Sequence, residues 1–161
     1  MESDVPTTPC QLFSDNTWAH TFLIRSSTKT KGSAMKSRLI LLGAGKIGDA
    51  ILNLLSHSGD YRITVADRDP ARLAHIDALR FPDVQTVRAD VSEAGALVDL
   101  IDGHEVTVSA SPYFLTPAIA AAAKKAGSHY FDLTEDVEST RAVKQLAEDT
   151  DTAFVPQCGL A

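Results

Sequence analysis

Residues 38–48 read RLILLGAGKIG and decide the fold. The first five form an apolar run that ends at a glycine, as buried strands do, and apolar residues at helical spacing follow over 46–57. Between the expected strand and helix stands the pattern Gly-x-Gly-x-x-Gly, made by Gly43, Gly45 and Gly48. These glycines would allow a tight turn, close approach of a phosphate to the backbone, and close helix–strand packing, respectively. The stretch therefore predicts a dinucleotide-binding loop.

The rest of the chain repeats this alternation of strand and helix. Further strands are expected at 61–66, 84–89, 105–110, 129–133 and 152–156, and further helices at 70–80, 92–101, 117–126 and 136–149. Asp69-Pro70 and Thr116-Pro117 each have the form of a capping residue followed by a first-turn proline. Strict alternation favours right-handed crossovers and a parallel sheet covered on both faces. The expected fold class is α/β, a doubly wound, parallel, six-stranded sheet of the Rossmann type.

The bulk properties exclude several classes of partner. The chain has 161 residues and a net charge of −6, so a nucleic-acid partner is not expected. No apolar run approaches the roughly 20 residues of a membrane span. The histidines and cysteines show no metal-binding spacing, so no metal site is expected. Cys10 and Cys158 predict free thiols and hence a reducing, cytoplasmic compartment.

Two regions differ in composition. Residues 1–34 are rich in Ser and Thr without sustained periodicity, and we interpret them as a disordered leader or extension. Residues 35–161 carry the whole strand–helix pattern and are expected to form the nucleotide-binding domain.

The residues at the end of the second expected strand indicate which nicotinamide cofactor, NAD or NADP, would bind. Asp67 lies 19 residues after Gly48, where a carboxylate can accept hydrogen bonds from the adenosine ribose and repel a 2′-phosphate, which favours NAD. The adjacent Arg68 could instead pair with a 2′-phosphate, so NADP stays open. The structural alternative for Asp67 is a second helix cap beside Asp69.

Two other loops follow strands at the same expected edge. Asp90 and Val91 could border the adenine, although Asp90 or Ser92 could equally cap the next helix. The loop after the fourth strand would pass under the nicotinamide ribose, the alternative being a plain turn into the next helix. Its residues are Ser109, Ala110, Ser111, Pro112 and Tyr113.

The polar residues after the fifth and sixth strands have no clear link to the cofactor. Asp132 could face a substrate amine or merely cap a helix, while Glu135 and Asp136 are interpreted as caps. No base is identifiable beside Cys158, which is interpreted as an inert thiol. No catalytic residue can be named from these patterns.

From Met35 to Ala161 the chain resembles the saccharopine dehydrogenase and lysine 6-dehydrogenase family. The matching pieces are LILLGAGKIGDAI, VADRDPARL, RADVSE, SASPYFLTPAIAAAAKKAGSHYFDLTED and FVPQCGLA. The resemblance implies reversible oxidation of an amino-acid amine to an imine, with hydride passing to a nicotinamide cofactor. It also implies phosphate-loop amides from Ala44, Lys46 and Ile47, together with the ribose, adenine and nicotinamide-side residues already named.

The resemblance also has a departure. Family members continue through a Pro-Gly turn into a substrate domain, whereas this sequence reads Cys158-Gly159-Leu160-Ala161 and stops. We therefore expect a missing substrate domain, no turnover by this chain alone, and self-association, for example as a homodimer, through surface that the missing domain would cover.

Two alternative functions share some of these features. A non-catalytic, nucleotide-sensing regulatory domain shares the glycine pattern and the acid after the second strand, but lacks the Ser-Pro-Tyr loop and the Tyr-x-Asp strand. A short-chain-type reductase would need a Tyr-x-x-x-Lys pair, and neither Tyr113 nor Tyr130 has that lysine.

Overall fold

The computed structural model describes residues 35–159, so the expected leader at 1–34 lies outside the described residues. Each expected strand and helix from residue 38 onward has a counterpart. In chain order the elements are β1 (Ser37–Leu42), α2 (Lys46–Ser58), β2 (Tyr61–Asp67), α3 (Pro70–Leu79), β3 (Val84–Arg88), α4 (Ala94–Ile101), β4 (Val106–Ser109), η1 (Tyr113–Leu115), α5 (Thr116–Ala126), β5 (His129–Asp132), α6 (Val137–Ala147) and β6 (Phe154–Val155).

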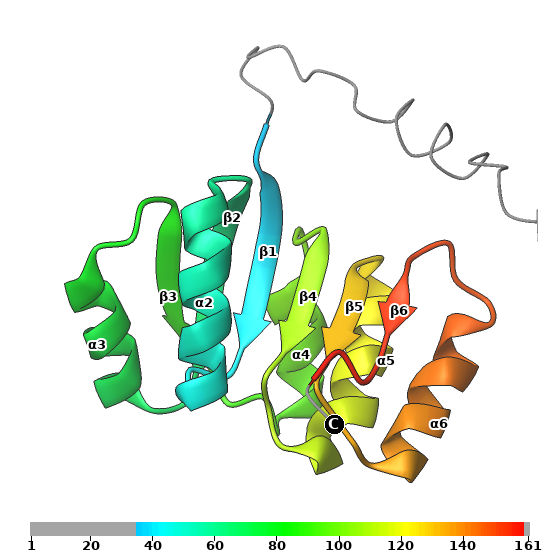
Figure 1. Cartoon of the computed structure of the whole chain (residues 1–161). Helices are drawn as coiled ribbons and strands as arrows, with labels where there is room; N and C mark the ends of the chain where they lie inside the picture. Colours follow the sequence, from blue (N-terminus) through cyan, green and yellow to red (C-terminus); the bar gives the residue numbers. More distant parts are fainter. Residues whose placement is uncertain (1–34, 160–161) are drawn as a thin grey trace, which may run out of the picture. The chain divides into compact units, whose positions relative to one another are not determined.

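The strands form one six-stranded sheet in the order β3-β2-β1-β4-β5-β6, and each neighbouring pair is parallel. This confirms the doubly wound Rossmann-type sheet. The strand order reverses between β1 and β4, and ligands of such sheets bind outside the carboxyl ends of the strands at that reversal. In Figure 1 all strand arrows point to the same edge, which is where the loops after β1 and β4 lie side by side.

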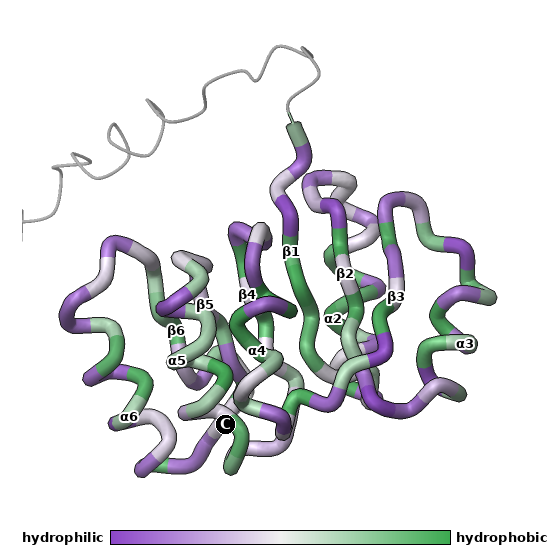
Figure 2. The backbone as a smooth tube through the Cα atoms, turned by 180° about the vertical axis from the view of Figure 1, so that it is seen from behind, coloured by the Kyte–Doolittle hydropathy of each residue, from purple (hydrophilic) through white to green (hydrophobic). Residues whose placement is uncertain are grey.

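Alternate side chains of β1 enter two separate cores. Leu39 and Leu41 pack with residues of α2 and α3 on one face, while Ile40 and Leu42 pack with α4, α5 and α6 on the other. Figure 2 shows β1 as a hydrophobic strand in the middle of the molecule. Burying each such side chain contributes roughly 1.5–3 kcal/mol. The central strand is thus held from both faces, which fixes the position of the glycine loop at its end.

Capping signals predict four helix starts, and two of them are confirmed, at α3 and, as described below, at α6. Asp69 caps α3 by accepting a hydrogen bond from the Ala71 amide at 2.9 Å, with Pro70 in the first turn. Thr116 is not a cap: the 3-10 turn η1 precedes it, so Thr116 is already the first residue of α5 and is buried. The helix expected from residue 92 begins only at Ala94.

Candidate functional site

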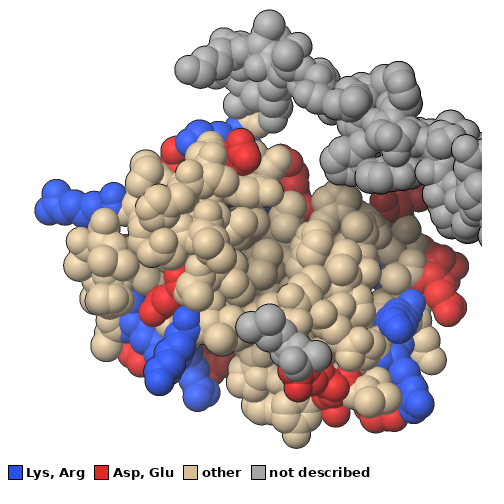
Figure 3. All heavy atoms as spheres, viewed as in Figure 1, with Lys and Arg blue, Asp and Glu red and all other residues tan. Residues whose placement is uncertain are grey.

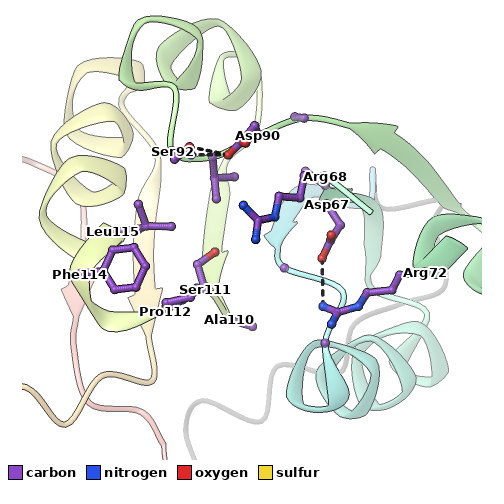
Figure 4. Close-up of a pocket in the computed structure, with 15 residues that line it drawn as sticks. Asp67, Arg68, Arg72, Asp90, Ser92, Ala110, Ser111, Pro112, Phe114 and Leu115 are labelled. Carbon is purple, nitrogen blue, oxygen red and sulfur yellow. Dashed lines mark hydrogen bonds and ion pairs between the residues drawn. The ribbon is translucent and has the colours of Figure 1, made fainter. Parts of the chain in front are cut away.

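A cavity of about 530 Å³ opens at the carboxyl ends of β1, β2, β3 and β4. The glycine loop and the start of α3 form one side of it, and the loop after β4 forms the opposite side, as Figure 4 shows. Its lining residues are Gly43, Gly45, Ala66, Asp67, Arg68, Arg72, Ala89, Asp90, Val91, Ser92, Ala110, Ser111, Pro112, Phe114 and Leu115. Four loops that are distant in sequence therefore converge on the edge where the sheet reverses.

The three glycines of the loop meet different surroundings. Gly43 has a φ of 106°, and a Cβ there would lie 2.9 Å from the Ala110 carbonyl oxygen. A Cβ on Gly48 would lie only 2.0 Å from the Gly43 carbonyl oxygen, so this position requires glycine. A Cβ on Gly45 would make only an ordinary contact, 3.6 Å from Arg72 Nη1. A pyrophosphate fits this arrangement, because the bare backbone at Gly45 and the N-terminus of α2 face the cavity.

Asp67 is buried at the end of β2, with 8% of its surface exposed. Its Oδ2 accepts a hydrogen bond from the Ala44 amide at 2.7 Å, and its Oδ1 accepts one from the Asp69 amide at 2.8 Å. The carboxylate therefore ties the glycine loop to the start of α3. Both of its oxygens already have a backbone donor, but neither donor is a first-turn amide of α3, whose cap is Asp69 alone. Asp67 therefore has a structural role that differs from the second helix cap considered as its alternative.

Two arginines stand beside this carboxylate. Arg68 is exposed and extends into the cavity, and it forms no ion pair within residues 35–159. Arg72 lies with its guanidinium 3.8 Å from Asp67 Oδ2 and 3.6 Å from Asp69 Oδ2. Figure 3 shows basic and acidic side chains together below α2 and α3, near the carboxyl ends of the strands. This side of the cavity thus offers two guanidinium groups to an anion.

Asp90 both lines the cavity and closes a turn. Its Oδ1 accepts hydrogen bonds from the Ser92 amide at 3.0 Å and the Ser92 hydroxyl at 2.7 Å, and these bonds hold the pKa of Asp90 below its ordinary value. Neither Asp90 nor Ser92 caps α4, because Glu93 precedes that helix without a side-chain cap. Val91 also lines the cavity, so the expected adenine border is exposed to a ligand.

The loop after β4 is attached to the end of β1. The Ala110 amide donates to the Leu42 carbonyl oxygen at 2.8 Å, and the Ser111 hydroxyl donates to the same oxygen at 3.1 Å. Pro112 and Phe114 complete this wall of the cavity. Neither Tyr113 nor Ser109 lines the cavity: Tyr113 is 58% exposed, and Ser109 is buried at the end of β4.

Three buried polar side chains belong to strands β4 and β5. Within the described part of the chain, Ser109 Oγ, Tyr130 Oη and Asp132 Oδ2 are buried without a hydrogen-bond partner. Burial, with the Asp132 carboxylate adding to it, raises the pKa of Tyr130 far above its ordinary value. Asp132 uses its other oxygen, Oδ1, to accept from the Thr134 amide at 2.9 Å and the Gln157 amide at 3.2 Å. It therefore connects the loops after β5 and β6.

The remaining polar candidates have structural contacts. The Asp136 side chain accepts from the Ser139 amide at 2.8 Å and caps α6, as predicted. Burial and the Asp132 carboxylate raise the pKa of the Cys158 thiol, which favours the protonated form over the reactive thiolate.

The cavity gathers most of the residues that the sequence singled out. The predicted residues that line it are Gly43, Gly45, Asp67, Arg68, Asp90, Val91, Ala110, Ser111 and Pro112, whereas Ala44, Lys46, Ile47, Gly48, Ser109 and Tyr113 do not. Sequence reasoning missed six lining residues, namely Ala66, Arg72, Ala89, Ser92, Phe114 and Leu115. For Arg72 a signal existed, because a residue two positions after the first-turn Pro70 lies in the first turn of α3, next to the ribose position.

The described residues offer neither a metal site nor a membrane span. Within residues 35–159 no group of three or more His, Cys, Asp or Glu side chains is placed to hold a metal ion. Among the helices described, none combines the length and the apolar character needed to cross a membrane.

Comparisons with known proteins agree with this geometry. Over 92 residues the chain is 32% identical to saccharopine dehydrogenase [NADP(+), L-glutamate-forming] of Schizosaccharomyces pombe, which covers 56% of this chain and 20% of that protein. The apo saccharopine dehydrogenase (L-Glu forming) of Saccharomyces cerevisiae has a similar fold, with a TM-score of 0.66 and 22% identity over 77% of this chain and 27% of that one. The WlbA dehydrogenase of Chromobacterium violaceum, solved with NADH and UDP-GlcNAcA, gives a TM-score of 0.60 at 18% identity over 78% and 36% of the two chains.

The chain spans only about a fifth to a quarter of the two saccharopine dehydrogenases. Residues 39–155 match the family described as the saccharopine dehydrogenase NADP binding domain. This match runs from the third residue of β1 to the end of β6 and includes every residue that lines the cavity. The chain belongs to that family, and its domain binds a nicotinamide dinucleotide.

Proposed function

We propose that this chain is the NADP(H)-binding part of an oxidoreductase that transfers hydride between an amino-acid amine and a nicotinamide. The observation that carries the proposal is the cavity at the sheet reversal, where Gly45 lies beside Arg72 and where Arg68 is also part of the lining. The family description and the name of the fission-yeast relative both specify NADP. The regulatory alternative has no comparable support.

The sequence alone favoured NAD because of Asp67, and the contacts of Asp67 now weigh against that preference. Its two oxygens accept amides of Ala44 and Asp69, and Arg72 lies close to Oδ2. A carboxylate with these contacts repels a 2′-phosphate less than a free one does. We therefore propose NADP as the preferred cofactor.

In the proposed reaction, oxidation of the amine to an imine would deliver a hydride to the bound nicotinamide and release a proton. The residues of this chain would bind and orient the cofactor. Backbone amides of the glycine loop would hold the pyrophosphate, Asp90 and Val91 would border the adenine, and Ser111 and Pro112 would support the nicotinamide side. We assign no residue of this chain to the amino-acid substrate.

A direct titration tests the proposed cofactor. The 161-residue chain is titrated with NADPH and with NADH while nicotinamide fluorescence is recorded. We expect saturable binding with a preference for NADPH. A clear preference for NADH would return the selecting role to Asp67, and absence of saturable binding of either nucleotide would refute the proposal.

Two further proposals come from the sequence. A reducing compartment such as the cytoplasm is supported by the free, exposed thiol of Cys158. Self-association is supported by exposed apolar side chains on α2, where Ile47 and Leu54 are 58% and 75% exposed. Cell fractionation and light scattering would test the compartment and the oligomeric state, respectively.

A further inference from the structure

Arg72 occupies a position in the cavity to which the sequence assigned no role. It stands in the first turn of α3, with Nη1 3.6 Å from where a Cβ on Gly45 would lie and 3.8 Å from Asp67 Oδ2. In dinucleotide-binding sheets the second glycine and the acid after the second strand flank the pyrophosphate and the adenosine ribose. A group between them, as Arg72 is, lies where a substituent on the ribose 2′-oxygen would come.

The contacts of Arg72 leave its guanidinium available. Its ion-pair distances of 3.8 Å to Asp67 and 3.6 Å to Asp69 exceed hydrogen-bond length, and its side chain is 54% exposed. The guanidinium therefore keeps donors for a further acceptor. A phosphate is well matched to it, because a guanidinium can donate two parallel hydrogen bonds to two phosphate oxygens.

Arg68 complements Arg72 from a neighbouring position. It follows Asp67 directly, and Figure 4 shows its side chain extending into the cavity while Arg72 approaches Asp67 from α3. The N-terminus of α3 adds its positive dipole end on the same side, although the Asp69 cap offsets part of it. Two guanidinium groups from different elements thus face one region of the cavity.

We propose that Arg72 is a specificity-determining residue: with Arg68 it holds the 2′-phosphate of NADP(H), and it shields that phosphate from the Asp67 carboxylate. This inference rests on the proposed function, since it requires that the cavity binds a nicotinamide dinucleotide. It predicts that removing Arg72 weakens binding of 2′-phosphorylated nucleotides selectively.

Calorimetric titration of the full 161-residue chain tests this selectivity. The variants are Arg72→Gln and the control Arg141→Gln, which removes an exposed arginine that pairs with Glu138 on α6. The probes are NADPH, NADH, adenosine 2′,5′-bisphosphate and ADP. Arg72→Gln should weaken NADPH and the bisphosphate about tenfold or more, and NADH and ADP less than about threefold, while the control changes none of them.

Each other outcome has a defined meaning. Retained NADH binding shows that Arg72→Gln is folded, and an unchanged ratio of NADPH to NADH affinity would then overturn the inference while leaving the proposed function intact. Equal weakening of both nucleotides, with an unchanged Tm, would overturn it in favour of a role in shaping the glycine loop. If glutamine lowers the Tm, Arg72→Met, which keeps an unbranched apolar stem and removes the charge, replaces it, and selective weakening is again required. A wild-type chain that binds neither nucleotide would refute the proposed function itself.

Discussion

Two buried aspartates, Asp67 and Asp132, each bond the end of one strand to the loop after the neighbouring strand. We call these two places the β1–β2 junction and the β5–β6 junction, and the two carboxylates differ in how they are bonded. Asp67 ends β2 and holds the loop after the neighbouring strand β1, while Asp132 ends β5 and holds the loop after its neighbour β6. Each also accepts the amide two residues further along the chain. The same local device therefore appears on both sides of the strand reversal.

The difference lies in which oxygens are used. Asp67 gives one oxygen to each amide and has Arg72 near Oδ2, at the wall of the cavity. Asp132 gives Oδ1 to both amides, and its Oδ2 is buried beside the Tyr130 phenol without a hydrogen-bond partner among the described residues. At the edge of the cavity, both carboxylate oxygens of Asp67 therefore accept backbone amides. At the other junction, one carboxylate oxygen of Asp132 is buried without a hydrogen-bond partner among the described residues.

The largest expected effect is the loss of stability when a glycine near each junction is replaced by alanine. Gly48→Ala would place a Cβ 2.0 Å from the Gly43 carbonyl oxygen, while Gly159→Ala, in the loop after β6, would place one 3.1 Å from the Leu133 carbonyl oxygen. We expect the first change to cost more than about 4 kcal/mol in the free energy of unfolding, and the second no more than about 1 kcal/mol. Urea denaturation measures both. Similar costs would mean that the loop after β1 can move as freely as the loop after β6.

A second pair of substitutions exchanges one oxygen for an amide nitrogen at each junction. Asp67→Asn turns one of two occupied acceptors into a donor that faces a backbone N–H, so we expect a loss of about 1–3 kcal/mol in the free energy of unfolding. Asp132→Asn can keep Oδ1 for both amides and direct its NH₂ towards Tyr130, so we expect a change below about 1 kcal/mol.

Chemical denaturation of both asparagine variants at pH 7 makes this comparison. Matching alanine variants serve as controls, because alanine removes every acceptor at either site and should destabilise both. If the cost at Asp132 equalled or exceeded the cost at Asp67, the distinction between the two carboxylates would be wrong.

The smallest expected effect concerns the acid that starts the helix after the β5 junction. The Ser139 amide, which donates to Asp136, lowers the pKa of that carboxyl below its ordinary value. Because the folded pKa is the lower one, the stabilisation is present above the ordinary pKa of about 3.9 and is lost as the pH falls through the folded pKa.

Thermal unfolding at pH 7 and below pH 4 checks this dependence. Asp136→Ala should lower the Tm by about 3 °C at pH 7, and the difference from wild type should shrink in acid. Asp136→Asn, which caps without titrating, should keep its advantage over alanine at both pH values. A difference between wild type and alanine that did not depend on pH would contradict the role of the ionised cap.

Local signals were sufficient where the interaction they encode is itself local. The cap at Asp69 and the cap at Asp136 each bond to an amide two or three residues away, and both were predicted. The Thr116 cap failed because the turn at Tyr113–Leu115 had no recognisable signal, and the start of α4 was misplaced because Asp90 and Ser92 close a turn with each other. Ser, Thr and Asp can each cap a helix or close a turn, and the sequence alone does not show which of the two a given residue does.

By itself, the sequence determined the doubly wound sheet and the place of the glycine loop, because apolar periodicity and glycine spacing act over a few residues. Only the tertiary structure decided what the carboxylates do: Asp67 bonds to an amide 23 residues away, and Asp132 to one 25 residues away. It also placed Arg72 beside Gly45 and Asp67, and this contact supports, together with the family match, the proposal of NADP in place of NAD. Such contacts depend on how the strands are ordered in the sheet. The sequence shows that a carboxylate is present, but it does not show whether backbone amides already bond to the carboxylate oxygens.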